Sequence, residues 1–78
     1  MSQHELVDLC KNYKGDEMDF NEIVKQFVEL DENNARWLAV KLQIDPLSVQ
    51  MYAKGSMRPV PKLRSICVSA ILSKFAAE

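Results

Sequence analysis

Apolar residues recur every three or four positions in several segments of this 78-residue chain, which is the spacing of amphipathic helices. The clearest stripe follows the i, i+3, i+4, i+7, i+8 pattern and consists of Phe20, Ile23, Val24, Phe27 and Val28. No stretch alternates with period two for long enough to predict a strand. The pattern therefore predicts an all-α protein, a compact bundle of about five helices in a single domain spanning residues 1–78.

Capping residues and helix breakers divide the chain into these helices. The predicted N-caps are Ser2 (with Glu5 completing a capping box), Asp19 (with Glu22 three residues on), Asn33 or Asn34, and Asp45. Gly15 and Gly55 are the predicted stops of the first and fourth helices. Pro61 is well placed to open the last helix, whose predicted buried face is Leu63, Ile66, Cys67, Ala70, Ile71 and Phe75.

The segment 35–54 has the pattern of two short helices that cross at a tight angle. Gln43-Ile44-Asp45-Pro46 interrupts the helical pattern, because Pro46 can open a helix but cannot continue one. Ala39 is small enough to let two helix backbones approach each other closely. The predicted core of this crossing is Leu38, Ala39, Leu42, Ile44, Val49 and Tyr52.

This arrangement resembles the helix-turn-helix of the Cro/repressor (XRE-like) family, with the motif at about residues 35–54. In that family the first helix carries a small residue between leucine-like residues, and the second opens with Asp or Ser before Pro. Gly55 and Pro59 match the family's "G-x-x-x-P" connection, so the resemblance covers roughly residues 35–72. Where the family usually has Gly at the end of the first helix, this chain has Gln43. We expect strain of about 1–2 kcal/mol if that residue is left-handed.

The resemblance implies that the second helix of the motif enters the DNA major groove. The residues expected to read bases are Leu47, Ser48, Gln50, Met51 and Lys54. Gln50 can form hydrogen bonds with adenine, and Lys54 can donate to guanine or phosphate. An apolar side chain can contact the thymine methyl group. The residues expected to contact phosphates are Arg36, Lys41, Arg58, Lys62 and Arg64.

The net charge of −1 conceals two halves of opposite sign. Residues 1–34 form an acidic extension with three lysines against nine acidic residues, a net charge of −6. Residues 35–78 contain seven basic and two acidic residues, a net charge of +5. A basic half that coincides with a helix-turn-helix is the charge distribution that a phosphate backbone requires, although charge on solvated helix faces also varies without a nucleic-acid partner.

Trp37 and Val40 point away from the predicted core face of their helix. Two interpretations remain open for this pair. Either the N-terminal helices cover them, or they form an exposed apolar patch for a homodimer or another partner.

Several classes of function are disfavoured. Cys10 and Cys67 are 57 positions apart with one histidine in the chain, so we expect buried free thiols and no metal site. The sequence contains no phosphate-binding glycine loop and no plausible catalytic pair. We therefore expect that the protein is not an enzyme and binds no cofactor. We expect a cytoplasmic protein, because no signal-peptide layout or membrane-spanning apolar run is present.

Two functions from different classes fit these features. The first is a small DNA-binding transcriptional regulator or repressor of the phage or plasmid Cro-like type, acting on double-stranded DNA as a homodimer. The second is a protein-binding module on the same scaffold, such as a phage-encoded inhibitor of a host nucleic-acid-binding defence complex. In that case the nine acidic residues of the extension would stand in for DNA phosphates.

Overall fold

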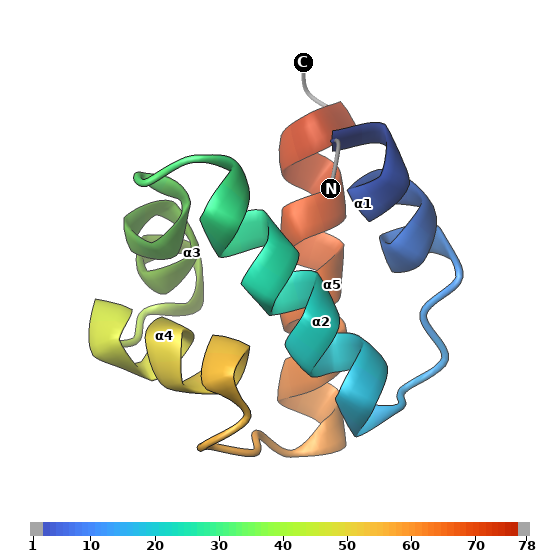
Figure 1. The fold of residues 1–78 in the computed structure, drawn as a ribbon. Coiled ribbons are helices and arrows are strands. Elements are labelled where there is room, and N and C mark those ends of the chain that lie inside the picture. Colours follow the sequence, from blue (N-terminus) through green and yellow to red (C-terminus); the bar gives the residue numbers. More distant parts are fainter. Residues whose placement is uncertain (1–2, 77–78) are drawn as a thin grey trace.

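Five α-helices make up the protein in the computed structural model, which describes residues 3–76 and contains no strand in that range. The helices are α1 (Gln3–Lys11), α2 (Glu17–Leu30), α3 (Asn34–Leu42), α4 (Pro46–Lys54) and α5 (Pro61–Ala76). The predicted all-α, five-helix fold is confirmed. In Figure 1, α2 crosses in front of the long α5, α3 and α4 lie on one side, and α1 lies on the other.

The two longest helices organise the core. Helix α2 packs on all four other helices, and α5 contacts α1, α2 and α3. The fully buried side chains come from all five helices: Leu6, Phe20, Phe27, Ile23, Val24, Leu38, Val49, Cys67 and Ile71. The stripe predicted on α2 lies in this core, except that Val28 is partly buried at its edge.

The start of α2 differs from the prediction. The helix begins at Glu17, and its N-cap is Asp16, whose carboxylate accepts the Met18 backbone N–H at 2.7 Å. Asp19 lies inside the first turn, where its charge still complements the helix dipole. Two acids three residues apart are both competent caps, so local sequence does not choose between them.

Among the other predicted boundaries, Pro61 is confirmed as the start of the last helix, whereas Gly15 was wrong as the stop of the first. Asn33 occupies the N-cap position of α3 without a capping side-chain bond, while the buried Asn34 amide donates to the Phe27 carbonyl at 2.7 Å. Gly15 is left-handed but lies beyond the last residue of α1, Lys11. Pro61 opens α5 as expected. The predicted cap at Ser2 lies outside the described residues.

Helix α5 is rotated relative to its predicted face. Ile66 was expected in the core but is exposed, whereas Arg64 and Val68 are buried beside Cys67 and Ile71. Apolar and small residues surround this helix on all sides, so its hydrophobic pattern does not define one direction. The packing of α1, α2 and α3 around it decides which side is covered.

Candidate nucleic-acid interface

The turn between α3 and α4 is closed by backbone hydrogen bonds. Gln43 is left-handed, with φ 57° and ψ 45°, and is the one non-glycine residue with positive φ in residues 3–76. The Ile44 N–H donates to the Ala39 carbonyl at 2.9 Å, and the Gln43 N–H donates to the Val40 carbonyl at 3.2 Å. This is a Schellman-type end that satisfies the last carbonyls of α3. Gln43 therefore does occupy the left-handed position that the family fills with glycine.

Helix α4 is fixed at its N-terminus and along its inner face. The Asp45 carboxylate accepts the Leu47 backbone N–H at 2.9 Å, and Pro46 occupies the first turn. Val49 and Tyr52 are buried, and the Tyr52 ring meets Phe20 of α2 edge-to-face with centroids 5.9 Å apart. The inner side of α4 is therefore held on the core.

The C-terminus of α4 is equally defined. Gly55 is left-handed with φ 76°, and the Ser56 N–H donates to the Met51 carbonyl at 3.0 Å. A Cβ at this glycine would lie 3.3 Å from the amide nitrogen of Asn21 on α2. The backbone conformation favours glycine here, and a Cβ would also require the Asn21 side chain to shift.

The outer face of α4 carries the five side chains predicted to read bases. Leu47 is 65% exposed and Lys54 is exposed, while Ser48, Gln50 and Met51 are partly exposed between them. Leu47, Gln50, Met51 and Lys54 follow i, i+3, i+4, i+7 spacing and so share one side of the helix. The structure thus brings these residues together on an accessible helix with fixed ends.

Four of the five predicted phosphate contacts are exposed. Arg36 and Lys41 belong to α3, Arg58 to the loop after α4, and Lys62 to the first turn of α5. The Arg58 guanidinium lies 3.7 Å from the Glu17 carboxylate, and its side chain is 74% exposed. Such an exposed pair is weak and leaves the arginine free to exchange partners.

Arg64 does not belong to this exposed set, which corrects its predicted role. Its residue is only 8% exposed, and its guanidinium donates to Glu17, to the Pro59 carbonyl and to the Gly15 carbonyl, each at 3.2 Å. These bonds tie the start of α5 to the start of α2 and to the loop before α2. No local signal distinguishes this buried arginine from its exposed neighbours, because its partners are up to 49 positions away.

Trp37 and Val40 separate into two environments. The Trp37 ring meets Phe27 of α2 edge-to-face at 5.8 Å, and the ammonium groups of Lys41 and Lys74 lie 5.6 and 5.3 Å from its centroid. Trp37 is therefore largely covered by α2 and by a residue of α5, and not by α1. Val40 is 71% exposed and stays on the surface beside the turn.

Comparisons of the chain with protein-family models, with curated proteins and with solved structures found no match. Within residues 3–76, no helix has both the length and the hydrophobicity needed to cross a membrane. The same residues contain no group of three or more side chains suited to hold a metal ion. The described residues form an all-α protein of five helices in which a short turn, residues 43–45, joins α3 to α4.

Proposed function

We propose that this protein is a small sequence-specific DNA-binding regulator of the Cro/repressor-like type, with α4 lying in the major groove. The observation that carries the proposal is the setting of α4. Its inner face and both ends are fixed, its outer face is accessible, and exposed basic residues occur on α3, in the loop after α4 and in the first turn of α5.

The charge of the chain segment that contains α4 supports an anionic partner. Residues 33–62 contain five basic residues and one acid, Asp45, whose carboxylate is engaged as the helix cap. Arg36 and Lys41 on α3 and Arg58 and Lys62 after α4 would hold phosphates on the two sides of the groove. These contacts would fix the register of α4 without carrying sequence information.

Base recognition would then fall to the outer face of α4. Gln50 can donate and accept two hydrogen bonds with an adenine edge, and Lys54 can donate to guanine. Leu47 and Met51 would contact thymine methyl groups. Because a single helix buries little DNA surface, we infer that two copies bind a palindromic site as a homodimer.

The test is the salt dependence of binding to double-stranded DNA, first of random sequence at low ionic strength and then of a site selected from it. We expect Arg58→Ala and Lys62→Ala to weaken binding to all sequences about equally. Each should reduce the log–log salt slope by about one unit. Gln50→Ala should instead relax preference at one position and leave the slope unchanged.

Lys14→Ala is the matched control, because the α1–α2 connection that carries Lys14 lies across the molecule from α3 and α4 (Figure 1). It removes one positive charge and should leave the salt slope intact. No binding to DNA at low ionic strength by the folded protein would reject the proposal.

The exposure of Leu47 and Val40 favours one alternative, a protein-binding module that uses the same surface. Two large apolar side chains on α3 and α4 suit a partner with an apolar groove, and the acidic extension suits a basic one. This alternative predicts a complex with a protein partner that is insensitive to Arg58→Ala but is weakened by Leu47→Ser.

A further inference from the structure

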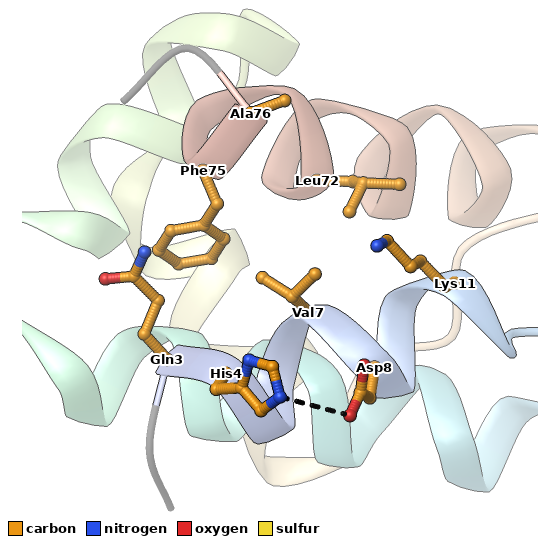
Figure 2. Close-up of a pocket in the computed structure, with 8 residues that line it drawn as sticks. All are labelled: Gln3, His4, Val7, Asp8, Lys11, Leu72, Phe75 and Ala76. Carbon is orange, nitrogen blue, oxygen red and sulfur yellow. Dashed lines mark ion pairs between the residues drawn. The ribbon is translucent and has the colours of Figure 1, made fainter.

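A second concave surface lies between α1 and α5, away from the helix-turn-helix. It is a groove of about 430 Å³ (Figure 2). Val7 of α1 and Leu72 and Phe75 of α5 form its apolar floor, and all three are only partly buried. Its volume falls within the range of sites that bind small molecules.

The groove exists because α1 and α5 use other residues for their mutual packing. Leu6 and Cys10 of α1 and Cys67 and Ile71 of α5 fill the buried side of the contact. Val7 and Leu72 lie one residue further round each helix and so face the outer edge of the seam. Apolar surface therefore remains accessible here without any gap in the core.

Charge is distributed unevenly along the groove. Figure 2 shows the Lys11 ammonium directed towards the space between the helices, near Leu72, at the end remote from Phe75. The Asp8 carboxylate turns towards His4 of its own helix, with Oδ2 and Nε2 4.0 Å apart. The Lys11 ammonium thus faces the apolar floor of the groove, while the Asp8 carboxylate lies beside His4 at its edge.

We propose that this groove binds a medium-chain fatty acid, with the carboxylate on Lys11 and the alkyl chain over Val7 and Leu72 towards Phe75. Gln3 and Lys11 bound the groove, and their separation along α1 corresponds to about 12 Å, a length that suits an extended acyl chain of medium size. A carboxylate can accept charge-assisted hydrogen bonds from the Lys11 ammonium. This site is independent of the proposed DNA contacts.

The aromatic residues provide an internal reporter for the site. Phe75 meets Phe27 edge-to-face at 5.9 Å, and Phe27 meets Trp37 in the same way at 5.8 Å. Trp37 is the sole tryptophan of the chain. Occupation of the groove should therefore change its fluorescence without the ligand contacting the indole.

The experiment titrates the full-length protein with octanoate below its micelle concentration, and follows binding by calorimetry and by NMR of the Val7 and Leu72 methyl groups. We expect saturable binding with shifts at both methyls. Lys11→Gln should weaken binding by roughly three- to tenfold, since the lysine contact is partly exposed. Lys14→Gln, a matched loss of one lysine outside the groove, should leave the affinity unchanged.

Octanol and octyltrimethylammonium, which share the chain but not the carboxylate, complete the design. Both should bind more weakly than octanoate to the native protein. Lys11→Gln should leave octanol binding unchanged and should slightly strengthen the binding of octyltrimethylammonium, because it removes a like charge. Equal binding of all three amphiphiles, or an unchanged affinity in the Lys11→Gln variant, would overturn the proposal. So would the absence of saturable octanoate binding, with the fold verified by circular dichroism.

Discussion

At the scale of single residues, Arg58 and Arg64 show how differently two arginines can use one partner. Both guanidiniums reach the Glu17 carboxylate, Arg64 at 3.2 Å and Arg58 at 3.7 Å. The Arg64 side chain is only 10% exposed and also donates to two backbone carbonyls. Solvent screens the Arg58 pair, whereas the loss of Arg64 would leave buried acceptors without donors.

Replacement of each arginine by alanine should therefore have unequal effects. Arg64→Ala should lower the free energy of unfolding by about 2–4 kcal/mol, because it removes a buried charged side chain that donates several hydrogen bonds. Arg58→Ala should cost less than about 1 kcal/mol. Urea unfolding of the two variants measures both values. Equal losses would mean that Arg64 is not the structural residue of the pair.

Gln43 is a second residue whose backbone decides its energetics. Its φ of 57° is unfavourable for a residue that carries a Cβ, which glycine lacks. Gln43→Gly removes this strain but also increases the conformational entropy of the unfolded chain, which partly offsets the gain. The net result should be an increase of about 0.5–1 kcal/mol in the free energy of unfolding. Gln43→Ala keeps the Cβ and should give no gain. Thermal unfolding of the two variants compares them, and stabilisation by alanine as large as by glycine would contradict this reason.

At the scale of helices, the crossing of α3 and α4 depends on the small size of Ala39. Ala39 is buried in the core cluster, and its carbonyl also accepts the Ile44 N–H that closes the turn. A larger side chain has no space unless the two helices separate. A larger residue at this position would therefore change the position of α4 relative to α3.

Ala39→Leu should consequently cost about 1–3 kcal/mol of unfolding free energy through overpacking. Val40→Leu, at the adjacent exposed position, adds one methylene and should be nearly neutral. Chemical denaturation measures both. An unchanged stability of Ala39→Leu would show that α3 and α4 do not cross as closely as the structure places them.

At the scale of the whole molecule, α1 and α5 each place a free thiol in the shared core. Burial raises the pKa of Cys10 to about 11. Burial, with a smaller contribution from Cys10, raises the pKa of Cys67 to about 12. Both values exceed the ordinary thiol pKa near 9, so the folded state retains protons that the unfolded chain releases.

The stability contribution of these thiols is complete below about pH 9 and is lost as pH rises towards 11 and 12. We expect the free energy of unfolding to fall over this range, by at most about 1.4 kcal/mol per pH unit for each thiol. The double variant Cys10→Ala/Cys67→Ala should be less stable at neutral pH but should show a smaller decline above pH 9. Urea unfolding at pH 7 and pH 10 provides the comparison. Parallel declines in both proteins would assign the alkaline loss to other groups.

Local sequence determined much of the fold. The five helices, the stripe on α2 and the Pro46-opened, Gly55-closed α4 follow from spacing, capping and backbone preference, which act within a few residues. The sequence left open whether Gln43 is left-handed, and the structure shows that it is. The outer face of α4 follows in turn, since the core residues Val49 and Tyr52 fix which side points outwards.

Only the tertiary structure decided which side of α5 is buried, where Arg64 points and that a groove lies along the outer edge of the α1–α5 contact. Apolar residues occur on several sides of α5, so the contacts with three other helices decided that Ile66 faces outwards. Arg64 was predicted to contact DNA but binds Glu17 and Gly15 instead. The positions of these two residues depend on how α2 and the loop before it pack. Burial and hydrogen bonding over such separations depend on the assembled fold, which no local pattern encodes.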